Sequence, residues 1–278
     1  MLSAALTPAQ NTGTPRFLNA TVATWFTAAL LGQLAFFSYI VAFYGSSLLE
    51  GNFEAWNRLQ AMGRTPFIAG DATGNWVFLT HALGAGLVVI GGVLQLIPVI
   101  RKRAPRLHRW NGRIFLTMVT VLSLSGFYLE WIRDDPPTTL SGFATTINGV
   151  LILSFAYMTL KAARARRFAD HRRWAIRLFL VSNAQWFTRV GLFAYLVMTQ
   201  VLGTGSANVG TFFEVWKFGA FLVPLAVAEL YLQCANQRPA FKAGVAMVMA
   251  VLTLFMSVGI VAYGAFTLKI ATGAPLSF

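Results

Sequence analysis

Apolar residues occur along this chain in long runs separated by short polar and basic stretches. A helix needs roughly 20 mostly apolar residues to cross the hydrocarbon core of a bilayer. Seven runs have about this length, and each predicts one transmembrane helix. They cover residues 21–45, 75–100, 113–133, 143–161, 174–200, 211–233 and 243–270. The pattern therefore predicts an all-α, polytopic membrane helical bundle.

Basic residues gather in two of the connections between these runs. One reads RKRAPRLHRWNGR (101–113) and the other KAARARRFADHRRWAIR (161–177). Connections rich in Lys and Arg remain on the cytoplasmic side of the membrane. With seven spans, the N-terminus is then inside and the C-terminus outside, and the expected location is the bacterial inner (plasma) membrane.

The composition supports a membrane protein and excludes several other classes. Apolar residues make up 56% of the chain and charged residues 11%, whereas a soluble domain is nearer a quarter charged. The net charge of +13 comes mostly from the two basic connections, so we expect no nucleic-acid partner. No repeat or low-complexity linker divides the chain, which indicates a single integral membrane domain over residues 1–278.

The sequence contains none of the familiar motifs of soluble enzymes. It has no Gly-rich phosphate loop, no metalloprotease helix motif and no nucleophile elbow. Cys234 is the single cysteine, which rules out an intrachain disulfide and a thiolate metal cluster. Lys269 lies too near the end of the last span to be the Schiff-base lysine of a retinal protein. We therefore predict no metal site and expect binding rather than catalysis.

Four ionisable residues are predicted to form a polar cluster in the outer half of the bundle, where each is a functional-site hypothesis by default. They are His81, Glu130, Arg189 and Glu214. One interpretation is a structural ion pair of Arg189 with either glutamate. The other is a ligand or proton site that includes the histidine, since histidine titrates near neutrality.

The two basic connections repeat a common pattern, LHRWNGR and DHRRWAIR. One interpretation is that charge fixes the topology while the tryptophans anchor the interface. The other is a shared anion site for a lipid head group, a phosphate or a quinone carbonyl, because arginine binds oxyanions bidentately. The second predicts that the imidazoles of His108 and His171 lie within about 12 Å of each other. Its residues are His108, Arg109, Arg113, His171, Arg172 and Arg177.

Residues of about 75–195 resemble domain-of-unknown-function family 2306, a group of bacterial multi-pass membrane proteins. The helices at 21–45, 211–233 and 243–270 are additions to this core. Ala175 stands where the family usually has methionine. The resemblance implies a membrane fold and no established activity. Its pattern falls on His81, Gln95, His108, Arg109, Gly112, Arg113, His171, Trp174, Arg177 and Arg189.

The function predicted from these features is that of a binding or transport-type protein that holds a small amphiphile or an anionic head group. Membrane lipids and quinone are the expected partners, and a homo-oligomer or a membrane complex is the expected assembly. No cofactor is predicted. One alternative is a haem b- or quinone-linked redox protein, which for a single haem needs two histidines at one depth. A second alternative is a purely structural subunit of a membrane complex.

Overall fold

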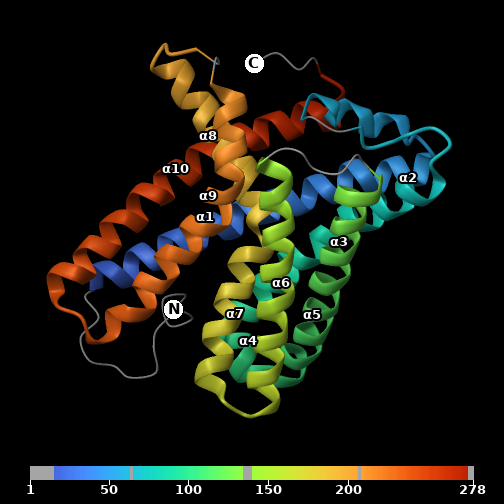
Figure 1. Ribbon diagram of the computed structural model, residues 1–278. Coiled ribbons are helices and arrows are strands. Elements are labelled where there is room, and N and C mark those ends of the chain that lie inside the picture. The colour runs from blue at the N-terminus through green and yellow to red at the C-terminus, as the bar shows by residue number, and fades with distance from the viewer. Residues whose placement is uncertain (1–15, 63–64, 134–139, 206–207, 275–278) are drawn as a thin grey trace.

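The computed structural model describes residues 16–62, 65–133, 140–205 and 208–274, and these residues form helices and connections without a strand (Figure 1). The protein is therefore all-helical, as predicted. The long helices are α1 (Arg16–Ile40), α3 (Ala72–Leu96), α5 (Pro105–Tyr128), α6 (Leu140–Arg164), α9 (Val209–Gln233) and α10 (Pro239–Thr272). The shorter ones are α2 (Ser46–Glu50), α4 (Pro98–Arg103), α7 (Phe168–Ser182) and α8 (Ala184–Val201).

Irregular helical segments extend several of these elements. A π-helical turn, η2 (Val41–Gly45), joins α1 to α2, and a second one, η4 (Leu129–Arg133), continues α5. Two 3₁₀ segments, η3 (Glu54–Met62) and η5 (Cys234–Asn236), lie in connections. The continuous stretch from α1 ends at Gly51, whose positive φ of 68° is a conformation that glycine adopts readily.

In the described part of the chain, six helical stretches are long and apolar enough to cross a membrane. They are Arg16–Glu50, Ala72–Leu96, Pro105–Arg133, Leu140–Arg164, Val209–Gln233 and Pro239–Thr272. Each overlaps one of the predicted runs. The shortest predicted run, 143–161, lies within the continuous 25-residue helix α6. The protein is therefore a multi-pass membrane protein.

The remaining predicted run, 174–200, is divided between α7 and α8 at Asn183. The Asn183 side-chain amide donates a hydrogen bond to the Phe179 carbonyl oxygen at 2.7 Å, so it competes with the helical backbone pattern. Its Oδ1 accepts a hydrogen bond from Nε2 of Gln33 at 3.1 Å. Both side chains are almost fully buried, at 0% exposure for Gln33 and 1% for Asn183. A buried polar contact to α1 thus marks the point where the helix is interrupted.

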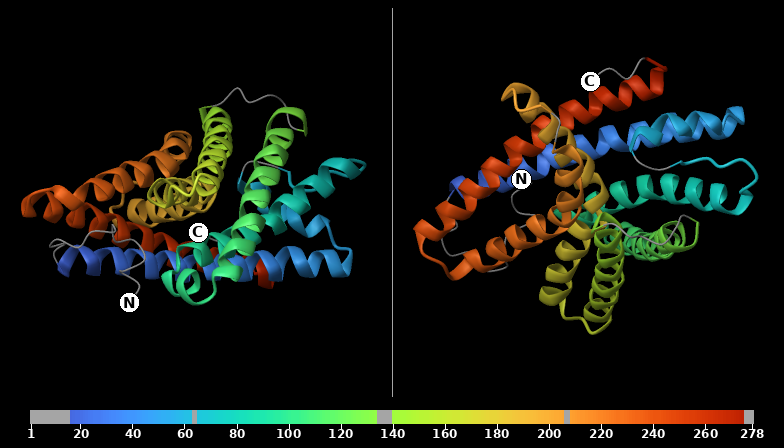
Figure 2. Two further views of the ribbon diagram at one scale, coloured as in Figure 1. Left: turned by 90° about the horizontal axis from the view of Figure 1, so that it is seen from below. Right: turned by 45° about the horizontal axis from the view of Figure 1, so that its top comes forward.

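The helices pack into one continuous bundle. α1 and α10 lie side by side and run in the same direction, while α9 and α10 diverge from their shared turn (Figure 2). α8 approaches α10 closely at Gly259, where a Cβ would collide with the Val190 carbonyl oxygen. A second group of helices is formed by α3, which packs on α5, and α6, which packs on α5 and α7. The consecutive helices α7 and α8 link this group to α10, because α7 packs on α6 and α8 packs on α10.

Candidate functional site

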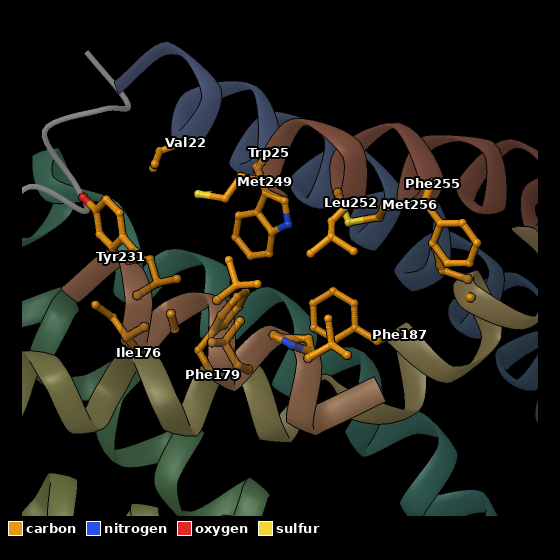
Figure 3. A pocket seen from close by; sticks show the side chains of 18 of the residues that line it. Val22, Trp25, Ile176, Phe179, Phe187, Tyr231, Met249, Leu252, Phe255 and Met256 are labelled. Atoms are coloured by element: carbon orange, nitrogen blue, oxygen red, sulfur yellow. The ribbon is translucent and has the colours of Figure 1, made fainter. Parts of the chain in front are cut away.

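An apolar cavity of about 100 Å³ lies between α1, α7, α8, α9 and α10 (Figure 3). Its wall is aliphatic, aromatic and thioether in character. The wall includes Val22, Trp25, Ile176, Phe179, Phe187, Pro224, Met249 and Met256. An apolar cavity of roughly this size stays dry and can accept an apolar guest. The cavity can therefore hold part of a hydrocarbon chain or ring without offering it a hydrogen bond.

The cavity has one polar end, which is formed by Tyr231. Figure 3 shows this side chain at one end of the wall, with its hydroxyl directed away from the apolar residues. Tyr231 interacts electrostatically with Arg172 of α7. Arg172 also interacts electrostatically with Arg101. Arginine titrates so high that the guanidinium keeps its charge.

The two histidines of the basic connections are brought together by α5 and α7. His108 and His171 lie close enough to interact electrostatically, with Arg101 also acting on His108. Nδ1 of His171 lies 3.1 Å from the Thr159 carbonyl oxygen, which can only accept, so this nitrogen is the donor. Nδ1 of His108 is buried and has no hydrogen-bond partner among the described residues. Part of this cluster therefore has unused hydrogen-bonding capacity.

The arginines predicted for the same site have different roles. Arg177 donates two hydrogen bonds to the Glu229 carboxylate, at 2.6 and 2.9 Å, and stacks 4.7 Å from the centre of the Trp174 ring. Arg113 stacks in the same way on Trp110, at 4.9 Å, and is exposed. Arg109 is also exposed. The structure thus groups His108, His171, Arg101 and Arg109, with Arg172 interacting with Arg101, and pairs Arg177 with an acid.

His81 of the predicted outer cluster lies at the contact between α3 and α5. Its Nδ1 is 2.8 Å from the Ser125 hydroxyl, and Gly126 lies directly beside the ring. The histidine therefore faces protein and not lipid. It also interacts electrostatically with Arg189.

Arg189 does not form the ion pair predicted for it. Its guanidinium donates a hydrogen bond to the Gln185 carbonyl oxygen at 2.8 Å and lies 5.9 Å from the centre of the Phe36 ring. The hydroxyl of Tyr263 lies next to it. None of the ion pairs among the described residues joins Arg189 to an acid. The predicted ion pair is wrong, because the guanidinium contacts groups of α8, α1 and α10 instead of an acid.

Neither of the two glutamates predicted for the outer cluster forms an ion pair with Arg189. Glu214 accepts a hydrogen bond from the backbone N–H of Ser141 at 2.6 Å, at the start of α6. A carboxylate is favourable at a helix N-terminus, where free N–H groups and the helix dipole attract negative charge. Glu130 lies in the π-helical turn η4 and is buried, with 5% of its surface exposed. Of the four residues, His81 and Arg189 interact with each other, and the outer cluster as a whole stays a prediction.

Comparison with known proteins identifies the chain. The family model described as "Predicted membrane protein (DUF2306)" matches residues 78–232, which is more than half of the sequence. The chain belongs to this family. No curated protein and no solved structure matches it.

The region matched to the DUF2306 family contains most of the residues that the structure brings together. It includes His81, His108, His171, Arg189 and Tyr231, and it extends through most of α9. The sequence-based reasoning missed Tyr231 and Arg101. Tyr231 lies near the end of an apolar run and forms part of no motif in the sequence, whereas Arg101 was one of several basic residues in its connection.

Proposed function

We propose that this DUF2306 protein binds a small amphiphile, a lipid or a quinone, as a binding or transport-type membrane protein. The observation that supports this most is the apolar cavity with Tyr231 at its end and Arg172 beside Tyr231. An amphiphile has the same division, with an apolar body and one polar end. In the proposed complex the apolar part occupies the cavity and the polar part meets Tyr231 and Arg172.

The polar end of the ligand carries an anionic oxygen or a carbonyl oxygen. The polar groups at this end of the cavity are the Tyr231 hydroxyl and the Arg172 guanidinium, which interact electrostatically with each other. Arg177 is not part of the set, because Glu229 already neutralises it. Guanidinium groups bind oxyanions through charge-assisted hydrogen bonds, so this environment favours an acceptor such as a phosphate or a quinone oxygen.

We further propose seven membrane passages in the inner membrane, with the N-terminus inside and the C-terminus outside. In this arrangement α7 and α8 together form the fifth passage. Figure 1 shows α4 and the turn between α6 and α7 at the same end of the bundle. Exposed basic residues lie at both places, including Arg101, Lys102 and Arg167, and the positive-inside rule makes this end cytoplasmic. A C-terminal topology reporter is expected to read as periplasmic, and a cytoplasmic result would refute the orientation.

The binding proposal is tested by identifying what co-purifies with the protein. The protein is purified in a mild detergent, and organic extracts are analysed by mass spectrometry for phospholipids and quinones. Ala228→Leu fills part of the cavity, since Ala228 is a buried residue of its wall. Val251→Leu is the matched control on the exposed surface of α10. The expected result is an amphiphile retained by the wild type and the control, and reduced several-fold in Ala228→Leu.

The same extracts separate the two sources of ligand, because phospholipids and quinones differ in mass and a quinone also absorbs in the ultraviolet. Equal retention of every lipid by the wild type and Ala228→Leu would contradict a cavity site. An absorption spectrum of the purified protein tests the alternative of a haem-linked redox protein. A strong Soret band would replace the proposal with a haem-linked function.

A further inference from the structure

The apolar cavity is partly open to its surroundings. Most of the partly exposed residues of its wall belong to α9 and α10, and they include Val223, Val227, Leu252 and Phe255. Ala228, which also lines the cavity, is buried. α9 and α10 diverge from their shared turn (Figure 2). The cavity therefore opens between these two helices, and we call the part bordered by the four partly exposed residues the lateral opening.

The lateral opening lies at membrane depth. Its residues belong to Val209–Gln233 and Pro239–Thr272, two stretches that can cross a membrane. Val223 lies ten residues before the end of α9, which is about 15 Å along the helix and roughly half the thickness of a hydrocarbon core. The outward-facing residues of the same helices, such as Leu222 and Leu254, are apolar and exposed. In a membrane the opening is therefore bordered by acyl chains and not by water.

The polar end of the cavity carries positive charge. Arg172 precedes Ile176 of the cavity wall by one turn, on the same face of α7. It interacts electrostatically with Tyr231 and with Arg101. Arg238, in the turn between α9 and α10, is exposed. Basic groups near the membrane surface attract anionic lipid head groups, so this end matches an anionic phospholipid better than an uncharged quinone ring.

The volume of the cavity also favours an acyl chain. An apolar cavity of roughly 150 Å³ holds a benzene ring, and this cavity measures about 100 Å³. A quinone ring with its substituents is larger than benzene and does not fit. An acyl chain is thin, so a few of its methylene groups can occupy the cavity while the rest of the chain stays in the bilayer. Such partial insertion requires a wall that is open to the bilayer.

From these observations we infer that the ligand is an anionic glycerophospholipid, one acyl chain of which enters the cavity from the bilayer through the lateral opening between α9 and α10. The inference rests on the proposed amphiphile site and narrows it, because it excludes a quinone as the ligand and water as the route of entry. The head group remains at the membrane surface beside Arg172. Bound lipid can then exchange with lipid of the surrounding leaflet without passing through water.

The test is the exchange of bound lipid in proteoliposomes. The protein is reconstituted with its co-purified lipid into vesicles of phosphatidylethanolamine and isotopically labelled phosphatidylglycerol, and native mass spectrometry follows the labelled lipid on the protein. Leu252→Trp and Val223→Trp narrow the lateral opening. Leu254→Trp and Val215→Trp are the matched controls at exposed positions of the same helices. The two variants of the opening should exchange lipid several-fold more slowly than the wild type, and the two controls should exchange it at the wild-type rate.

A second measurement tests the charge of the head group. The wild type should retain phosphatidylglycerol in preference to phosphatidylethanolamine. Arg172→Gln should reduce this preference, whereas Arg173→Gln, at an exposed neighbouring position of α7, should keep it. Thermal unfolding shows whether each variant is folded. If Arg172→Gln does not fold, the preference of the wild type decides the ligand class.

The outcomes separate this inference from the proposed function. Equal exchange rates in the variants of the opening and in their controls would overturn the lateral route. A bound quinone, or equal retention of the two phospholipids by the wild type, would overturn the ligand class and leave the amphiphile site in place. A wild-type protein that retains no amphiphile would refute the site itself.

Discussion

Arg177 and Arg189 lie on either side of the helix break at Asn183, and their surroundings differ. Arg177 on α7 makes two hydrogen bonds to the Glu229 carboxylate. Arg189 on α8 has no acid among the described residues and faces aromatic side chains and hydroxyls. A third arginine, Arg133, resembles Arg177, because it pairs with Asp71 at 2.8 Å. The comparison distinguishes arginines that join two elements through an acid from Arg189, which has no acid partner among the described residues.

The largest effect is expected at Asn183, which separates the two arginines. Asn183→Ala removes the hydrogen bond to the Phe179 carbonyl and leaves the Gln33 amide without its acceptor. Unsatisfied buried polar groups typically lower stability by about 1–3 kcal/mol each, so we expect a loss of about 2–3 kcal/mol in the free energy of unfolding. Thermal unfolding in detergent measures it, with Ser154→Ala at an exposed position of α6 as control. An unchanged unfolding temperature would show that the contact does not stabilise the break.

The second-largest loss of stability is expected at Arg177, the arginine that is paired with an acid. Arg177→Gln leaves the Glu229 carboxylate without its partner. Because the Glu229 side chain is 41% exposed, the expected loss is about 1–2 kcal/mol, below that of a fully buried pair. The double variant Arg177→Gln/Glu229→Gln should recover part of the stability. If both variants equal the wild type in unfolding temperature, the pair does not contribute.

A smaller, pH-dependent effect is expected at Asp71, at the start of α3. Hydrogen bonds from the Gly74 N–H and from Arg133 lower the pKa of this carboxyl below its ordinary value near 4. A lowered folded-state pKa contributes stability above the ordinary pKa, and this stability is lost as the pH falls through the lowered value. Asp71→Asn should therefore unfold at a lower temperature than the wild type at neutral pH, and the difference should shrink below about pH 4. A difference that does not change with pH would contradict this cause.

The smallest effect is expected at the arginine without an acid. Arg189→Gln leaves no carboxylate unpaired among the described residues, and it removes a buried charge whose isolation is unfavourable. The variant should therefore unfold at the same temperature as the wild type or slightly above it. A loss as large as that of Arg177→Gln would mean that Arg189 is held by a structural partner. The difference in unfolding temperature between Arg177→Gln and Arg189→Gln therefore tests the comparison more directly than either variant alone.

Much of the fold could be predicted from the pattern of apolar runs. Helix length is fixed by the thickness of a membrane, and six of the predicted runs correspond to helices that can span one. The orientation of His81 toward protein was also predictable, because the small residues Gly84 and Gly91 share its helix face. The division of the run at 174–200 was not, since it depends on a hydrogen bond between Asn183 and the distant Gln33.

The sites were less predictable than the helices. Helical periodicity indicates which residues share a face, but not which neighbouring helix that face meets. Arg189 was therefore assigned to the wrong partners, and it meets α1 and α10 instead. Tyr231 and Arg172 are far apart in sequence and become neighbours through the packing of α7 on α9. The sequence left a shared site of His108 and His171 as one of two interpretations, and the electrostatic interaction of the two imidazoles supports it.

The most direct test of the proposed amphiphile site is photo-crosslinking with a phosphatidylglycerol analogue that carries a diazirine in its acyl chain. The labelled peptides are identified by mass spectrometry. The site predicts labelling concentrated on the cavity wall, at residues such as Val227, Met249 and Met256, with competition by unlabelled lipid and reduction in Ala228→Leu. Labelling distributed over exposed residues such as Leu254 and Val261, without competition, would contradict the site.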